Sequence, residues 1–150
     1  DVMRHTLSSG FALAVTPIAE TVLATTAQGL EAGEVKIRTA QGEIPAYRAV
    51  PAGDAKRKWP VLLVVHEIFG VHEHIKDLWR RFAKLGYFAI APDLFVRQVD
   101  ASKFADIKQL QQEVVSKASD AQVAGDLDAT VAWASTQAHA DVAKLGITGF

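Results

Sequence analysis

Val61-Leu62-Leu63-Val64-Val65 is a run of β-branched and aliphatic residues with no polar residue inside it. A strand with one solvated face would alternate apolar and polar side chains, and this run does not. Continuous apolar runs of this length are typical of strands that are buried on both faces, as in a parallel sheet. The run therefore predicts an inner strand of a sheet that helices cover.

The next segments follow the same scheme of buried strand and amphipathic helix. A helix is predicted over His72–Leu85, with Gly86 as its C-cap residue. A second buried strand is predicted over Tyr87–Ala91, which Pro92 stops. One apolar stripe supports the helix, formed by Ile75, Leu78, Trp79, Phe82 and Leu85.

The remainder of the chain repeats this alternation after an irregular excursion over Asp93–Ala105. Helices are expected over Asp106–Ser116 and Ala121–Gln137, and a last strand over Lys144–Thr148. The inner face of the second helix is expected to consist of Val123, Leu127, Val131 and Ala134. Strands that alternate with helices predict an α/β fold with a mostly parallel sheet and right-handed crossovers.

The N-terminal third has weaker patterns. Residues 1–33 are expected to form an extended arm, with one short helix around Ile18–Ala24. Strands are predicted over Val35–Arg38 and Ile44–Val50, and Pro45 favours an edge position for the second. No domain boundary is visible, so residues 1–150 are interpreted as one domain.

Composition narrows the class of protein. The chain is 49% hydrophobic and 22% charged, which is typical of a globular domain. Its net charge is -1, with no basic patch or acidic tail, so we expect no nucleic-acid partner. The apolar runs are too short to span a bilayer, so no membrane association is expected. The absence of cysteine is compatible with a cytoplasmic protein and excludes a thiolate metal site within these residues.

Three histidines near Glu67 and Glu73 raise the alternative of a metal site. His72 and His74 would lie roughly 200° apart around a helix of 3.6 residues per turn. His66-Glu67 is followed by Ile68-Phe69-Gly70, so the His-Glu-x-x-His zinc signature is absent. We therefore expect no metal and no organic cofactor.

The final residues, Leu145-Gly146-Ile147-Thr148-Gly149-Phe150, carry the predicted last strand into a glycine. In α/β-hydrolases a strand delivers its nucleophile on a sharp turn with the pattern Gly-x-nucleophile-x-Gly. Gly149 would be the first glycine, Phe150 the x, and position 151 the nucleophile. We expect the chain to be the front part of an enzyme, with the apolar face of its last strand left uncovered.

The loop His66–Val71 follows the first buried strand at its carboxyl end, where open α/β sheets bind ligands. In hydrolases of this architecture, one N–H group of this loop supports the oxyanion, and we assign that role to Ile68. An ordinary strand-to-helix turn is the alternative. His66 itself could hydrogen-bond within the loop or be a buried strand-end residue, and we favour the second interpretation.

Four stretches of the chain carry a specific set of motifs: Val65-His66-Glu67-Ile68-Phe69-Gly70-Val71-His72-Glu73-His74-Ile75, Arg80-Arg81-Phe82-Ala83-Lys84-Leu85-Gly86-Tyr87, Ala91-Pro92-Asp93-Leu94-Phe95-Val96-Arg97-Gln98 and Gly146-Ile147-Thr148-Gly149-Phe150. In these stretches the chain resembles the dienelactone hydrolase family (the carboxymethylenebutenolidases). The likeness runs from about Gly10 to the last residue, and two of its pieces, Glu-Ile-Phe-Gly and Pro-Asp-Leu-x-x-Arg-Gln, are highly specific together.

The resemblance implies a Cys–His–Asp hydrolase on a single α/β-hydrolase domain, incomplete in this chain, with the triad beyond residue 150. Glu67 matches the family's loop glutamate, which contacts the thiol and takes part in its activation. A thiol must become a thiolate to attack an ester, and a carboxylate in a partly buried cleft can accept that proton. The alternative for Glu67 is a loop carboxylate that hydrogen-bonds to backbone N–H groups.

The resemblance also suggests the substrate, a small ester or lactone. Phe69 would shape the cleft, and Arg97 is either a substrate contact or a structural ion-pair partner. Relatives that act on dienelactone hold its carboxylate with arginine, but only Lys103 and Lys108 lie in the corresponding region here. Dienelactone itself is therefore in doubt. The rival hypothesis is a catalytically inactive α/β-hydrolase-like fragment or binding module, and the oligomeric state is left open.

Overall fold

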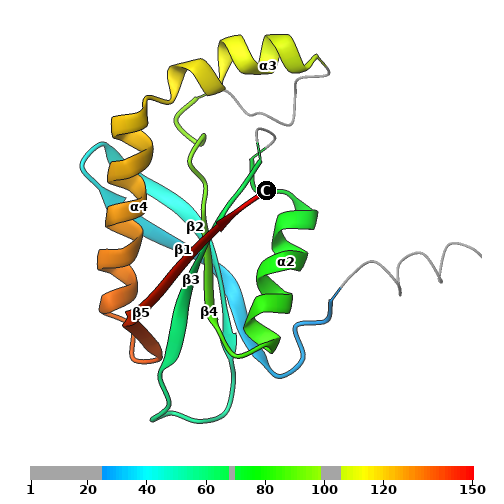
Figure 1. The fold of residues 1–150 in the computed structure, drawn as a ribbon, viewed down its shortest axis with the longest axis vertical. Helices are drawn as coiled ribbons and strands as arrows, with labels where there is room; N and C mark the ends of the chain where they lie inside the picture. The colour runs from blue at the N-terminus through cyan, green and yellow to red at the C-terminus, as the bar shows by residue number, and fades with distance from the viewer. Residues whose placement is uncertain (1–24, 68–69, 99–105) are drawn as a thin grey trace, which may run out of the picture.

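The computed structural model describes residues 25–67, 70–98 and 106–150, which form a twisted five-stranded sheet with helices on both faces (Figure 1). The strand order is β1-β2-β4-β3-β5. Strands β4, β3 and β5 are parallel to one another, and β2 is antiparallel to both β1 and β4. The elements are β1 (Leu30–Thr39), β2 (Gly42–Pro51), β3 (Trp59–Val65), α2 (Glu73–Lys84), β4 (Phe88–Pro92), α3 (Ile107–Glu113), the 3-10 helix η2 (Val115–Lys117), α4 (Asp120–Ser135) and β5 (Ala140–Gly149).

The two long helices lie on opposite faces of the sheet, and the strand order explains why. The chain moves from β3 to β4 in one direction through α2, and then returns past β3 to β5 through α4. Right-handed crossovers in opposite directions place their helices on opposite faces. Figure 1 shows α2 and α4 flanking the sheet in this way.

The two faces of β3 and β4 explain their uninterrupted apolar sequences. On the α4 face, Val61 and Leu63 pack in one core cluster with Phe88 and Ile90. On the α2 face, Val64 packs in a second cluster. Its other buried members are Ala49, Ile75, Trp79, Ala83, Ala89 and Ala91. Burial of one such aliphatic side chain stabilises the fold by about 1.5–3 kcal/mol, so neither face tolerates a polar residue.

The C-terminal end of α2 is a Schellman motif, which requires the predicted glycine. Gly86 has φ +95° and donates its N–H to the carbonyl of Ala83 (2.9 Å), while Tyr87 donates to Phe82 (3.2 Å). A Cβ at Gly86 would lie 3.2 Å from the ring of Trp59. Leu85 is the C-cap residue and is 74% exposed, so its predicted place in the buried stripe is wrong.

Gly86→Ala should destabilise the full-length protein by about 1–2 kcal/mol, because the left-handed conformation is unfavourable for a residue with a Cβ. Gly125→Ala is the matched control. Gly125 lies inside α4, is exposed, and has open space where its Cβ would be. Alanine there should stabilise the helix by about 0.5–1 kcal/mol. Urea unfolding measures both changes, and equal effects of the two substitutions would contradict this account.

Two predictions about the N-terminal strands are wrong. Strand β2 is an inner strand between β1 and β4, not an edge strand. Pro45 is tolerated because the pairing with β4 begins at Ala46, and the carbonyl of Pro45 still accepts the N–H of Asp93 (2.9 Å). Residues 30–33 were predicted to belong to an extended arm but form the start of β1, which begins at Leu30. The rest of the predicted arm up to residue 24, with the helix expected around Ile18–Ala24, lies outside the described residues.

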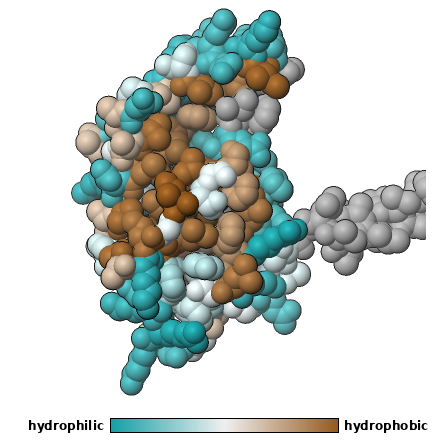
Figure 2. All heavy atoms as spheres, in the orientation of Figure 1, coloured by the Kyte–Doolittle hydropathy of each residue, from teal (hydrophilic) through white to brown (hydrophobic). Residues whose placement is uncertain are grey.

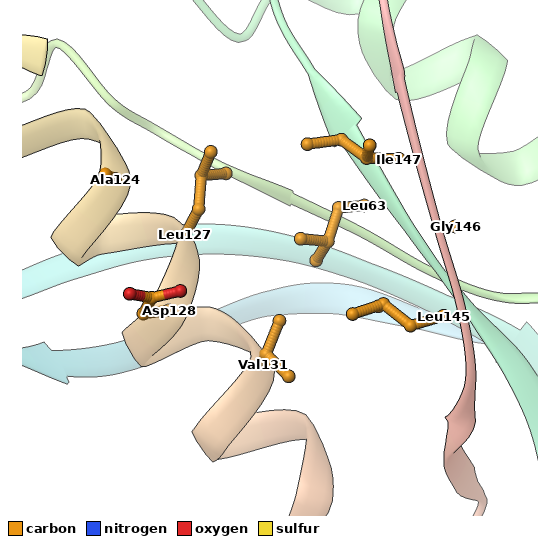
Figure 3. Close-up of a pocket in the computed structure, with 8 residues that line it drawn as sticks. All are labelled: Leu63, Ala124, Leu127, Asp128, Val131, Leu145, Gly146 and Ile147. Carbon is orange, nitrogen blue, oxygen red and sulfur yellow. The ribbon is translucent and has the colours of Figure 1, made fainter.

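Strand β5 is an edge strand with exposed apolar side chains, as the sequence predicts. Leu145 is 47% exposed and Ile147 is 61% exposed. Figure 2 shows apolar residues gathered over this side of the molecule. A groove of about 370 Å³ runs between α4 and β5. Its lining, drawn in Figure 3, is Leu63, Ala124, Leu127, Asp128, Val131, Leu145, Gly146 and Ile147.

This groove lies along the face of the sheet rather than at the ends of the strands. Leu127 and Val131 of α4 reach toward Leu63 and Leu145, and Asp128 is the one charged residue of the lining (Figure 3). Such a surface offers little polar chemistry. In open α/β sheets, ligands bind instead at the carboxyl ends of the strands. Within the described part of the chain, no helix is long and apolar enough to cross a membrane.

Candidate functional site

The carboxyl ends of β3 and β5 lie side by side at the point where the strand order reverses. The two strands are paired in parallel from Val61 opposite Leu145 to Val65 opposite Gly149. Beyond these residues the chain leaves β3 through His66 and Glu67, and leaves β5 through Phe150. In open α/β sheets, ligands bind in the crevice outside the strand ends at such a reversal.

His66 is a buried residue at the end of β3, 6% exposed, as the favoured interpretation predicts. It also makes hydrogen bonds on both sides of its ring. The backbone N–H of Leu94 donates to Nε2 (3.0 Å), and Nδ1 lies 2.7 Å from the carbonyl oxygen of Glu67. Because Nε2 is an acceptor, Nδ1 must carry the proton of the neutral ring and donate it to Glu67. His66 thus links the loop after β3 to the segment after β4.

The electrostatic surroundings favour the neutral form of this ring. Burial lowers the pKa of His66 below its usual 6.5, because the imidazolium would lose its hydration. The Glu67 carbonyl and the Asp93 carboxylate, whose Oδ1 lies 3.9 Å from Nε2, act in the opposite direction, and His72 lowers the pKa further. The edge of the Phe95 ring packs against the imidazole, with centroids 4.9 Å apart.

Glu67 is held through its backbone. Its carbonyl accepts hydrogen bonds from His66 and from the N–H of Gly70 (3.1 Å), which has φ +77°. Its side chain is half-buried, and within residues 25–67, 70–98 and 106–150 no hydrogen bond or ion pair engages its carboxylate. Ile68 and Phe69, the predicted oxyanion and cleft residues, lie outside the described residues.

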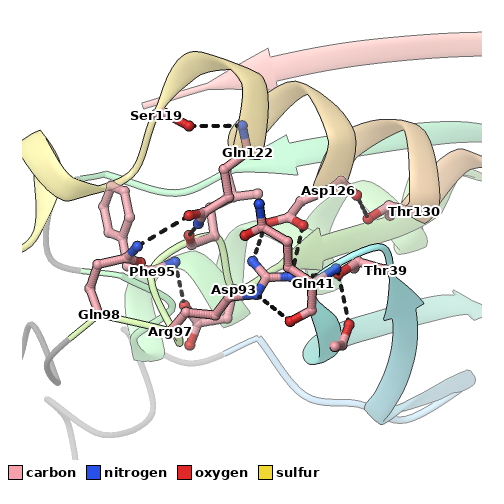
Figure 4. Close-up of polar contacts among 12 residues, drawn as sticks. Thr39, Gln41, Asp93, Phe95, Arg97, Gln98, Ser119, Gln122, Asp126 and Thr130 are labelled. Carbon is pink, nitrogen blue, oxygen red and sulfur yellow. Dashed lines mark hydrogen bonds and ion pairs between the residues drawn. The ribbon is translucent and has the colours of Figure 1, made fainter.

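Arg97 forms a structural ion pair in the turn after β4 (Figure 4). Its guanidinium binds the Asp126 carboxylate in a bidentate way, at 2.7 Å to Oδ2 and 3.0 Å to Oδ1. It also donates to Thr39 Oγ1 (2.5 Å) and to the carbonyl of Gln41 (3.3 Å) in the β1–β2 turn. With three guanidinium nitrogens engaged by protein groups, this geometry fits the structural alternative rather than a substrate contact.

The partner of Arg97 is a residue whose burial the helix pattern did not predict. Asp126 and Thr130 lie on the inner side of α4 with Ala134. Asp126 is 3% exposed and Thr130 is 0% exposed. The Thr130 hydroxyl donates to the carbonyl of Asp126 (2.7 Å). Spacing of four residues along one helix face was the available signal, because Asp126, Thr130 and Ala134 share a stripe.

The histidine geometry differs from the prediction. His72 is the N-cap of α2 and has an extended backbone, so the helical angle between His72 and His74 does not apply. Their rings stack instead, with centroids 6.1 Å apart and planes 16° from parallel. Among the residues that the structure describes, no group of three potential ligands is placed to hold a metal ion.

Comparison with known proteins identifies the family. The sequence profile of the dienelactone hydrolase family matches residues 44–150. The chain is 59% identical over 150 residues to a "Putative carboxymethylenebutenolidase" of Methylorubrum extorquens, covering 99% of this chain and 51% of that protein. The chain belongs to the dienelactone hydrolase family. A "Putative carboxymethylenebutenolidase" of Escherichia coli K12 is 46% identical over 148 residues, with 99% of this chain and 54% of that protein covered.

Solved structures agree with this assignment. A crystal structure named as a "Putative Dienelactone Hydrolase" from Klebsiella pneumoniae matches with a TM-score of 0.77 and 48% identity, over 81% of this chain and 50% of that chain. An esterase from Pyrobaculum calidifontis, 18% identical, matches with a TM-score of 0.58 over 97% of this chain and 42% of that chain, which supports the α/β-hydrolase fold alone. The chain spans about half the length of the relatives that it matches.

Proposed function

We propose that this member of the dienelactone hydrolase family is the N-terminal part of an enzyme that cleaves a small ester or lactone through a cysteine acyl-enzyme. The family profile and the relatives named as carboxymethylenebutenolidases support hydrolase chemistry. The cysteine mechanism rests on the resemblance of the loop around Glu67 and of the pattern that begins at Gly149.

The pairing of β3 with β5 is the observation that carries the proposal. Val65 lies opposite Gly149, and these two residues are the last of their strands. If the chain continued in the same register for two residues, position 67 would lie opposite position 151, the position proposed for the nucleophile. Neighbouring strands are about 4.8 Å apart. A thiol at that position would therefore start within reach of the Glu67 carboxylate.

The chemistry assigns one role to each group of the loop. Glu67 accepts the thiol proton, and the thiolate attacks the ester carbonyl carbon. The backbone N–H of Ile68 stabilises the oxyanion that forms, and collapse of this intermediate expels the alcohol and leaves a thioester. Water then hydrolyses the thioester to the acid and restores the thiol. Phe69 would line the cleft, while Arg97 holds the turn after β4 rather than the substrate.

Trapping of the acyl-enzyme tests the proposal. The full-length protein, mixed with p-nitrophenyl acetate and quenched with acid during turnover, should gain the mass of one acetyl group. Peptide mapping should place that group on the residue that follows Phe150. A protein that releases no p-nitrophenol and gains no mass would favour the rival, a binding module without catalysis. An acyl group on another residue would contradict the placement of the nucleophile.

A further inference from the structure

We propose that His66 is a positioning residue of this site: in its Nδ1–H form it clamps the backbone of Glu67 to the segment after β4, and protonation of the ring breaks its hydrogen bond to Leu94. This inference rests on the proposed function for its kinetic consequences. Its structural part, the tautomer and its two hydrogen bonds, is independent of any activity.

The hydrogen bonds define what the clamp does. The carbonyl of Glu67 receives the ring proton of His66, so the orientation of the peptide between Glu67 and the next residue depends on that bond. Together with the bond from Gly70, this hydrogen bond orients the backbone of the residue that would accept the thiol proton.

The other side of the ring fixes the clamp to the sheet. Leu94, whose N–H donates to Nε2, is 2% exposed and lies two residues after the end of β4. Asp93 is tied in turn to the carbonyl of Pro45 in β2. The loop of β3 is therefore attached through His66 to a segment that the neighbouring strands already hold.

Protonation must break the Leu94 side of this arrangement, while Nδ1–H still donates to the Glu67 carbonyl. A proton on Nε2 would point at the Leu94 N–H, and two donors cannot share one hydrogen bond. Two titratable groups face the ring: the carboxylate of Asp93, which would attract Nε2–H, and His72 at the start of α2, which lowers the pKa of His66. The half-buried carboxylate of Glu67 lies on the neighbouring residue. The ring would therefore exchange Leu94 for Asp93.

The direction of the pH effect follows from the lowered pKa of His66. Between its lowered value in the folded protein and 6.5, the unfolded chain binds a proton that the folded chain does not. The contribution of His66 to stability is therefore fully present above pH 6.5 and is lost as the pH falls through that window. Any catalytic contribution of the Leu94 hydrogen bond is lost at the lower, folded-state pKa.

Two substitutions separate the clamp from simple packing. Glutamine offers an amide N–H for the Glu67 carbonyl and a carbonyl oxygen for the Leu94 N–H, but it cannot titrate. Leucine fills space without either bond. In the full-length protein at pH 8, His66→Leu should lower kcat for p-nitrophenyl acetate about tenfold, the cost of one lost hydrogen bond, with a smaller change in KM. His66→Gln should restore most of kcat. Because glutamine does not titrate, the acid limb of its pH–rate profile should contain one ionisation fewer.

Long-range ¹H–¹⁵N correlation spectra of the histidine rings supply a readout without turnover. The clamp requires Nδ1 of His66 to be protonated and Nε2 to be unprotonated at pH 8. His139→Gln is the control, since His139 lies at the opposite, amino end of β3 and β5 and its ring contacts the carbonyl of Arg57 (3.1 Å). This control should leave the rate and its pH profile unchanged.

Three results would each overturn the clamp. They are a wild-type kcat in His66→Leu, a pH–rate profile of His66→Gln that superimposes on that of the wild type, and a neutral His66 ring protonated at Nε2. If His66→Leu does not fold, His66→Gln and the spectra decide the matter. If the wild type has no esterase activity, the proposed function fails. The tautomer and the pH dependence of Tm, which should flatten below pH 6.5 in His66→Gln, then still decide the clamp.

Discussion

Glu67→Gln should slow hydrolysis of p-nitrophenyl acetate by the full-length protein by about 10²–10⁴-fold, the usual contribution of a positioned proton acceptor. The amide has nearly the shape of the carboxylate but cannot accept the thiol proton. The loop should keep its conformation, because the bonds that hold it reach the Glu67 carbonyl and not its side chain. Stopped-flow measurement of the first turnover would place the loss in the acylation step.

Glu73→Gln is the matched control for this substitution. Glu73 lies six residues further along, at the start of α2; its side chain is 78% exposed and pairs with Lys76 (3.1 Å). Its amide variant should turn over at the wild-type rate, since an exposed ion pair of this kind contributes little. Unchanged turnover in Glu67→Gln would remove Glu67 from the mechanism, even if a cysteine acyl-enzyme were trapped.

Arg97→Met should cause the largest loss of stability, about 3–5 kcal/mol, because it leaves the Asp126 carboxylate buried without its partner. The Asp126 side chain is 4% exposed and that of Arg97 is 18% exposed. For a protein of this size, the loss corresponds to a fall in Tm of about 10 °C. Differential scanning calorimetry and urea unfolding of the full-length protein measure it.

Lys117→Met is the control for a surface ion pair. Lys117 and Glu113 are also 2.7 Å apart, but their side chains are 56% and 49% exposed, so the loss should stay below about 1 kcal/mol. The double variant Arg97→Met/Asp126→Leu should recover most of the stability, since two apolar residues leave no uncompensated charge. A double variant that is as unstable as Arg97→Met would show that the damage comes from lost packing.

The carboxyl end of β3 separates what local sequence patterns predict from what they do not. The carboxyl end was predicted well: the buried run, the following loop and the parallel partner all follow from local apolar pattern and glycine positions. The two bonds of His66 were not predicted together, since one of them joins residues 28 positions apart. The spacing of residues in the sequence does not predict which backbone N–H will donate to the histidine ring after folding.

Apolar side chains were predicted better than buried polar ones. The inner positions Leu127, Val131 and Ala134 of α4 belong to or pack against the core, as expected. Asp126 and Thr130 are more deeply buried than their polarity suggests. Burial of a carboxylate becomes tolerable only when an arginine arrives from a distant turn with matching geometry. Arg97 comes from the turn after β4, so the sequence of α4 alone does not reveal this pairing.

By itself, the sequence determined the kind of elements, their order and the parallel arrangement of the C-terminal strands. Hydrophobic periodicity and the positions of glycine and proline are properties of neighbouring residues, so they can be identified without the structure. It also determined the family through the motifs around Glu67 and Pro92. Only the tertiary structure decided that β2 is an inner strand, that Arg97 closes on Asp126, and that His66 bridges two strand ends. These depend on contacts between residues far apart in the chain, whose geometry is set once the whole sheet has formed.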